Sequence, residues 1–250
     1  MPLTTPFTQK DWTSRCEWGC EAVNALAPAD VIIVVDVFSF STCVDVAVSR
    51  GVTMIPYGWN GWNDPSAAEF ARAHGAELAG KRRLSRYSLA PKSYLDAPAG
   101  LRCVLPSPNG ARVSLAAAGS DAVILTGCLR NARAVAEFAQ QAGRTFNVIP
   151  SGERWLDGSL RPALEDALGA GAILSHLPGP RSPEAEAAVA IFERCRGNLI
   201  MTLDACASGR ELDQRGHHDD KFIAGELDGS ACVPRLDGVG FVDHRLSSSV

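Results

Sequence analysis

The residue best placed to do chemistry is an aspartate that follows a short, fully apolar run. Asp36 comes directly after residues 31–35, which are all valine or isoleucine. Such a run is typical of a strand covered on both faces, and ligands gather beyond the carboxyl ends of strands in open α/β sheets. Ser41 and Thr42, at the expected start of the next helix, could present hydroxyl and N–H groups to an anion. The alternative is that Asp36 caps a turn and Ser41 caps the helix.

A second candidate is the dipeptide Asn109-Gly110, between an expected strand at 102–105 and an expected helix at 113–118. Asn-Gly favours a tight turn, which leaves the first N–H groups of the helix free to face an oxyanion. Arg112 could add a bidentate contact to a phosphate. An ordinary strand–helix turn is the alternative.

Two acidic pairs in the second half of the chain could hold a metal ion. Glu165-Asp166 lies in an expected helix, and Asp219-Asp220 opens a helical stretch that runs to about residue 227. Neighbouring side chains on a helix project about 100° apart, so only one of Glu165 and Asp166 should face a shared centre. Oxygen ligands suit Mg²⁺ better than Zn²⁺. The alternatives are a solvated acidic face and acids stabilised by the helix macrodipole.

The elements that must position these residues alternate between strand-like and helix-like patterns. Helices should begin after Asp64-Pro65, after Asn131 and after Ser182-Pro183. Another helix should begin near Ser159 and direct Leu160, Leu164 and Leu168 toward the core. The expected strands are residues 31–35, 52–56, 102–105, 122–125 and 146–149. Strands alternating with helices predict a sheet between two helical layers.

Composition narrows the class of protein. The 250 residues are 46% apolar and 21% charged, as in a globular protein, and no repeat or linker divides them, so a single domain over 1–250 is expected. A net charge of −4 argues against a nucleic-acid partner. No apolar run approaches the roughly 20 residues that cross a membrane, and no targeting segment is visible. We therefore expect a cytoplasmic protein whose eight cysteines are reduced.

Taken together, these segments resemble the 2-phosphosulfolactate phosphatase family, Mg²⁺-dependent acid phosphatases of coenzyme M biosynthesis. The resemblance runs from about residue 30 to about residue 240. Its matching stretches are Val34-Val35-Asp36-Val37 with Ser41-Thr42, Asn109-Gly110 with Arg112, Cys128 to Ala132 around Asn131, Ser159-Leu160 with Glu165-Asp166 and Ala170-Gly171, and then Gly209, Leu212, Gly216, Asp220 and Val233-Pro234. It implies the family's three-layer α/β/α fold, a Mg²⁺ requirement and phosphomonoester hydrolysis.

The chain departs from the family pattern in three places. Ser39 stands where the family usually has an arginine, and Pro108 stands where it has a threonine before Asn-Gly. The segment 85–91 has lost an acid and an asparagine. These changes affect the expected substrate more than the expected reaction. The basic side chains of the neighbouring loop could bind an anion instead; they are Lys81, Arg82, Arg83 and Arg86.

The resulting hypothesis is a metal-assisted phosphatase that acts on a small anionic phosphate ester. Its metal ligands would be Asp36, Asp220 and one of Glu165 and Asp166. Its phosphate-binding groups would be Asn109, Gly110 and Arg112, with Ser41, Thr42 and Asn131. Water would attack in line, or Asp36 would form a covalent phospho-aspartate. A non-catalytic protein that binds an anionic metabolite, a lyase or isomerase, and a homodimer are alternatives that stay open.

Overall fold

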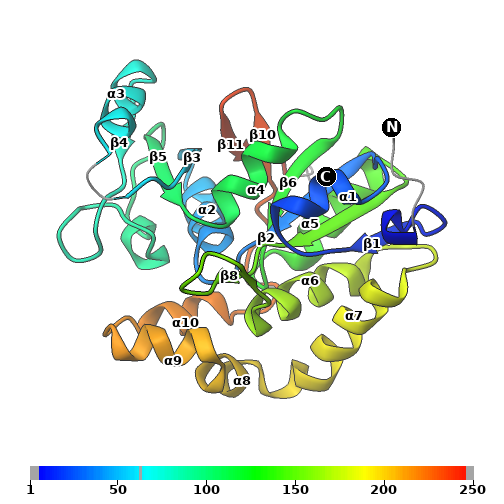
Figure 1. Ribbon diagram of the computed structural model, residues 1–250. Helices are drawn as coiled ribbons and strands as arrows, with labels where there is room; N and C mark the ends of the chain where they lie inside the picture. Colours follow the sequence, from blue (N-terminus) through cyan, green and yellow to red (C-terminus); the bar gives the residue numbers. More distant parts are fainter. Residues whose placement is uncertain (1–5, 62–63, 246–250) are drawn as a thin grey trace, which may run out of the picture.

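The chain folds around one mixed sheet in the computed structural model, which describes residues 6–61 and 64–245 (Figure 1). The sheet has nine strands, in the spatial order β1 (Ser14–Cys16), β7 (Phe146–Pro150), β2 (Val31–Val35), β6 (Val123–Gly127), β10 (Pro234–Asp237), β11 (Gly240–Asp243), β3 (Thr53–Gly58), β5 (Arg102–Ser107) and β4 (Glu77–Leu78). All five strands expected from the sequence are present, with ends shifted by no more than two residues.

The sheet consists of two parallel blocks that meet at a hairpin. Strands β1, β7, β2 and β6 form one block, and β3, β5 and β4 form the other. The hairpin of β10 and β11 lies between them and pairs antiparallel with β6 on one side and with β3 on the other. Residues near the end of the chain therefore complete the middle of the sheet.

Helices cover both faces of the first block. Ile32 and Val34 pack in a cluster with α1 (Gly19–Ala25) and α4 (Gly110–Ala117). The alternate residues of β2 pack in another cluster with α5 (Ala132–Ala142) and α6 (Leu164–His176). Every residue of β2 is consequently buried, which explains its unbroken apolar sequence. The predicted three-layer α/β/α fold is confirmed.

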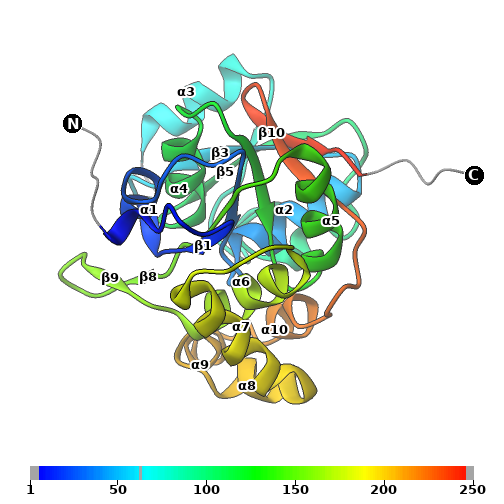
Figure 2. The same cartoon turned by 90° about the vertical axis from the view of Figure 1, so that its right-hand side faces the viewer.

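The second block is covered in the same way. Met54, Cys103 and Leu105 pack against α2 (Phe40–Ser49) and the 3₁₀ turn η2 (Pro91–Tyr94), whereas Ile55 and Val104 pack against α3 (Pro65–Ala73). The remaining helices gather on the side of the sheet that carries α6 (Figure 2). They are α7 (Pro183–Cys195), α8 (Leu199–Ala205), α9 (Ala207–Gln214) and α10 (Asp219–Ala224). The 3₁₀ turn η3 (Arg196–Asn198) connects α7 to α8, and η1 (Pro6–Thr8) precedes β1.

Two of the predicted helix starts have the expected caps. The Asp64 carboxylate accepts a hydrogen bond from the N–H of Ser66, and the Ser182 hydroxyl accepts one from the N–H of Ala185. Each cap precedes a proline at the beginning of its helix. These starts depend on neighbouring residues alone, which is why the sequence identifies them.

The predicted helix start near Ser159 is wrong. Residues 153–161 form a small hairpin of β8 (Glu153–Arg154) and β9 (Leu160–Arg161), and α6 begins only at Leu164. The turn contains Gly158 at φ +83° and an Asp157 carboxylate that accepts the N–H of Ser159. Leu160 lies in the hairpin and Leu164 is 40% exposed, so of the three predicted core leucines only Leu168 is fully buried.

All eight cysteines are free thiols, and most are buried. The longest helices in the described part of the chain have 13 residues, and none there combines the length and apolarity that crossing a membrane requires.

Candidate active site

A pocket of about 610 Å³ opens where the carboxyl ends of β2 and β5 meet. Its lining comes from segments that are far apart in the sequence, within 36–39, 79–89, 105–109, 153–161 and 208–217, together with Trp59. This size is in the range of small-molecule sites. The position agrees with the expectation that ligands bind beyond the carboxyl ends of strands.

Asp36 is held in this pocket by the first turns of two helices. Its Oδ1 accepts the N–H of Phe40 at 3.1 Å, at the start of α2, and its Oδ2 accepts the N–H of Gly110 at 2.8 Å, at the start of α4. Helix N-termini stabilise a negative charge. Burial nevertheless raises the pKa of Asp36 to about 6, and the nearby Glu165 carboxylate adds to this rise. Asp36 thus both caps helices and lines the pocket.

Glu153 is a second carboxylate of the pocket, half-buried, and sequence reasoning missed it. Its Oε2 accepts a hydrogen bond of 2.9 Å from Nδ2 of Asn109. Burial, followed by the charge of Asp36, raises the pKa of Glu153 to about 8. The one available signal was its position shortly after β7, because β7 lies beside β2 and their carboxyl ends share one edge of the sheet.

Asn109 lies in the pocket as predicted, but its contacts are made by the side chain. While Nδ2 donates to Glu153, the buried Oδ1 has no hydrogen-bond partner among the described residues. Buried polar atoms are nearly always paired, so an unpaired one indicates a missing partner such as an ion, a water or a ligand. A donor or a cation is therefore expected beside Asn109 Oδ1.

Glu165 and Asp166 are both buried, but they do different things. Asp166 accepts the N–H of Val37 at 2.7 Å and the N–H of Gly152 at 2.9 Å, so it ties the loop after β2 to the segment before β8. Glu165 lies close enough to raise the pKa of both Asp36 and Glu153, and it accepts a weak hydrogen bond from the thiol of Cys206. Neither acid is among the residues that line the pocket, so the expectation that one of them faces a shared metal centre stays a prediction.

Asp220 is not among the residues that line the pocket. Its carboxylate forms an ion pair with Arg82, whose Nη2 also donates to the Ser39 hydroxyl at 2.9 Å. Burial raises the pKa of Asp220, although Arg82 opposes this shift. The residue predicted to bind metal is thus the partner of an arginine.

The predicted set of three acidic metal ligands is not assembled. Among residues 6–61 and 64–245, no three histidine, cysteine, aspartate or glutamate side chains lie together in an arrangement that could hold an ion. Mg²⁺, however, commonly binds one or two carboxylates plus waters and substrate phosphate oxygens. Asp36 with the unpaired amide oxygen of Asn109 and the neighbouring Glu153 provides oxygen donors of this kind.

The predicted phosphate-binding hydroxyls point into the protein. The Ser41 hydroxyl contacts the N–H of Asp36 at 2.9 Å and the Thr126 hydroxyl at 2.7 Å. The Thr42 hydroxyl donates to the carbonyl of Val37 at 2.8 Å. The Gly110 N–H is likewise bound to Asp36. These groups shape the loop that carries Asp36, and they do not line the pocket.

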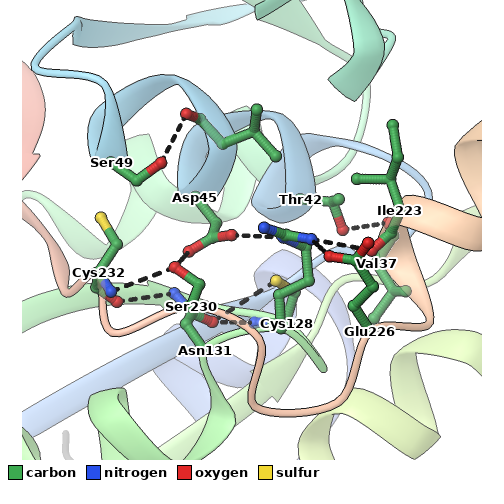
Figure 3. Close-up of polar contacts among 12 residues, drawn as sticks. Val37, Thr42, Asp45, Ser49, Cys128, Asn131, Ile223, Glu226, Ser230 and Cys232 are labelled. Carbon is green, nitrogen blue, oxygen red and sulfur yellow. Dashed lines mark hydrogen bonds and ion pairs between the residues drawn. The ribbon is translucent and has the colours of Figure 1, made fainter. Parts of the chain in front are cut away.

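Asn131 and Arg112 also lie outside the pocket. Asn131 Oδ1 accepts the N–H of Cys128, and its Nδ2 donates to the carbonyl of Cys232, so the side chain fastens a loop to the segment that leads to β10 (Figure 3). Arg112 is exposed on α4. The motif positions resemble those of the family, but the structure gives Asn131 a stabilising role.

Positive charge in the pocket comes from elsewhere. Arg154 and Arg161 belong to the hairpin beside Glu153, and the charge of Arg161 opposes the rise in the pKa of Glu153. Arg82 and Arg215 line the pocket as well, together with His217. Burial lowers the pKa of His217, and the charges of Arg82, Arg83 and Arg215 lower it further. Of these cations, sequence reasoning considered only those of the 81–86 loop.

Comparison with known proteins gives a consistent result. The family model described as 2-phosphosulpholactate phosphatase matches residues 20–238. A probable 2-phosphosulfolactate phosphatase of Gloeobacter violaceus is 30% identical over 219 residues, covering 84% of this chain and 90% of the relative. The 2-phosphosulfolactate phosphatase of Methanothermobacter thermautotrophicus is 32% identical over 191 residues, covering 74% and 75%. A probable 2-phosphosulfolactate phosphatase of Thermus thermophilus is 28% identical over 224 residues, covering 85% and 90%.

Proposed function

Because the chain belongs to the 2-phosphosulfolactate phosphatase family, we propose that it hydrolyses the phosphate monoester of a small acid in the cytoplasm, with 2-phosphosulfolactate or a close analogue as substrate. The products are the hydroxy acid and inorganic phosphate. Membership of a family of enzymes does not favour the alternative of a non-catalytic binding protein.

The observation that carries this proposal is the pairing of a buried and a half-buried carboxylate with an unpaired amide oxygen. Asp36 and Glu153 line one pocket with Asn109, whose Oδ1 has no partner among the described residues. Asp36 and Asn109 Oδ1 would hold a Mg²⁺ ion there. Bound Mg²⁺ would draw negative charge from the phosphoryl oxygens and so lower the barrier to attack.

The protein's own groups supply the remaining roles. Arg154 and Arg161, on the hairpin beside Glu153, are suited to bind phosphoryl oxygens through bidentate hydrogen bonds. Glu153 orients the attacking water and takes its proton, because it is a carboxylate that lines the pocket beside Asn109, next to the proposed metal position.

The proposal is tested by measuring phosphate release from 2-phosphosulfolactate with Mg²⁺ and with EDTA. We expect turnover only with the metal, and we expect Asp36→Asn to abolish it while circular dichroism stays unchanged. Asp121→Asn removes a similar charge from an exposed position outside the pocket and should turn over like the wild type. Unchanged turnover in Asp36→Asn would remove Asp36 from the mechanism, and no phosphate release from any small phosphorylated acid would refute the function.

A further inference from the structure

We propose that Arg82 binds a second anionic group of the substrate, separate from the phosphate, and that Asp220 is a positioning residue for Arg82. The second group is a carboxylate or a sulfonate. This inference deepens the proposed function and rests on it, since it concerns the other end of the same pocket.

Arg82 is fixed in place before any ligand arrives. Nη1 forms the ion pair with Asp220 of α10, and Nη2 donates to the Ser39 hydroxyl at 2.9 Å. The side chain is only 17% exposed, yet it lines the pocket. A guanidinium has five N–H groups, and no acceptor for the others is found within residues 6–61 and 64–245. Arg82 can therefore bind an oxyanion without first losing side-chain freedom.

Asp220 lies behind the guanidinium. It does not line the pocket, whereas Arg82 does. The carboxylate therefore holds the arginine from the protein side, while the cavity meets the guanidinium. The carboxylate repels a bound anion less than Arg82 attracts it, because the guanidinium lines the cavity and the carboxylate does not. The same arrangement explains why Asp220 can be important to the site without binding a metal.

The cations of the pocket fall into two groups. Arg154 and Arg161 share the β8–β9 hairpin with Glu153, and Arg161 acts electrostatically on that carboxylate. Arg82 and Arg215 act together on His217 instead. The elements that hold the two groups differ. Arg154 and Arg161 are on the strands of the hairpin, whereas Arg82 is held by Asp220 of α10 and by Ser39 of the loop after β2.

The pocket is large enough for both ends to be filled at once. Its volume of about 610 Å³ lies well above what a single phosphate needs and inside the range for whole small ligands. With the phosphate at Asp36, Asn109 and Arg161, another anionic group on the same small molecule would be directed to Arg82. A substrate with no second anion would leave this arginine unused.

The experiment compares three phosphate esters on the wild type and on Arg82→Met, Arg82→Lys and Asp220→Asn. The esters are 2-phosphosulfolactate with two further acid groups, 2-phospholactate with a carboxylate only, and glycerol 2-phosphate with none. We expect Arg82→Met to lower kcat/KM for 2-phosphosulfolactate by about 10- to 100-fold, mainly through KM, as loss of a charged hydrogen bond implies. In the same variant, kcat/KM for glycerol 2-phosphate should change less than about 3-fold.

The other variants test positioning. Arg82→Lys should restore part of the affinity, and Asp220→Asn should show a smaller loss with the same dependence on the substrate. Arg86→Gln is the matched control, because it removes an exposed arginine of the same loop that does not line the pocket. Since Arg82→Met leaves the Asp220 charge unpaired, the double variant Arg82→Met/Asp220→Asn repeats the comparison without that charge.

The outcomes separate this inference from the proposed function. An equal loss for all three esters, or no loss in the double variant, would overturn it. The effect of Arg82→Met on 2-phospholactate shows which group Arg82 binds. A loss as large as that for 2-phosphosulfolactate indicates the carboxylate, and a loss as small as that for glycerol 2-phosphate indicates the sulfonate. If the wild type hydrolyses none of the esters, the proposed function fails, and titration calorimetry with 3-sulfolactate still decides the role of Arg82. Weaker binding to Arg82→Met than to Arg86→Gln would support it, and equal binding would refute it.

Discussion

The N–H of Gly110 donates a hydrogen bond of 2.8 Å to Oδ2 of Asp36, a residue 74 positions earlier in the chain. Asp36 follows β2 and Gly110 begins the helix after β5, and four strands separate β2 from β5 in the sheet. The hydrogen bond therefore joins the segments that follow two strands far apart in the sheet. This one hydrogen bond joins the two blocks at the point where the pocket forms.

Gly110→Ala should damage the site directly. A Cβ at this position would lie 2.5 Å from Cδ1 of Phe40 and 2.8 Å from Oδ2 of Asp36, and Phe40 is fully buried. Phosphatase activity should fall by at least about 10-fold and stability by about 1–3 kcal/mol, the usual effect of overpacking. Kinetics and urea unfolding measure both. Gly119→Ala is the control, because its Cβ would lie 3.9 Å from the carbonyl oxygen of Ala116, an ordinary contact. Equal behaviour of the two variants would contradict the prediction.

Glu153→Gln should lower kcat by about 10²- to 10⁴-fold, as expected for the loss of a general base. The amide keeps the size of the side chain and a hydrogen-bond acceptor for Asn109, so KM and the melting temperature should change little. Steady-state kinetics and thermal unfolding measure the two effects. Glu69→Gln, on the exposed face of α3, should match the wild type. A kcat of Glu153→Gln within a factor of about three of the wild type would exclude this role.

Asp45→Ala should destabilise the protein without changing the pocket. Asp45 is fully buried in α2, where it accepts hydrogen bonds from Arg130 Nε at 2.8 Å and from the Ser230 hydroxyl at 2.6 Å (Figure 3). Removing one partner of a buried ion pair costs about 3–5 kcal/mol. Urea unfolding should show this loss, whereas Glu193→Ala, from an exposed pair with Arg196, should cost less than about 1 kcal/mol. If Asp45→Ala also cost less than about 1 kcal/mol, the prediction would be refuted.

Asp30 should make stability depend on pH. It accepts the N–H groups of Arg144 and Thr145 and the Thr145 hydroxyl, and these bonds lower its pKa below the ordinary 3.8. Because the folded state holds the proton less tightly, the contribution is complete above the unfolded pKa and disappears as pH falls through the lower folded value.

Asp30→Ala should therefore cost about 1 kcal/mol at pH 7, a small value because the residue is exposed and screened. The difference from the wild type should shrink toward zero below about pH 3. Unfolding curves at several pH values measure it. A difference that stays constant from pH 7 to pH 3 would show that the charge of Asp30 is not the cause.

The parts of the fold that depend on neighbouring residues could be predicted from the sequence. The five apolar runs became strands, and Asp64 and Ser182 cap the helices that follow them. The position of Asp36 beyond a buried strand was equally readable, because a strand covered on both faces has an unmistakable composition. Asn109 also lies in the pocket as predicted.

The partners of these residues could not be predicted, because they come from distant segments. Nothing near Asp220 indicates that Arg82, 138 residues earlier, will pair with it. Glu153 was not identified as a site residue because residues 153–161 were expected to lead into a helix. They form a hairpin instead, and this hairpin places Glu153 beside Asn109. Helical spacing also could not show that Asp166 binds two backbone N–H groups.

The hairpin of β10 and β11 fixes the distance between the two halves of the pocket. Among the described strands, the two parallel blocks have no direct pairing, and residues 234–243 pair with both of them. Asp36 follows a strand of one block and Asn109 follows a strand of the other. A substitution that loosens the hairpin would therefore move these two residues relative to each other without touching either.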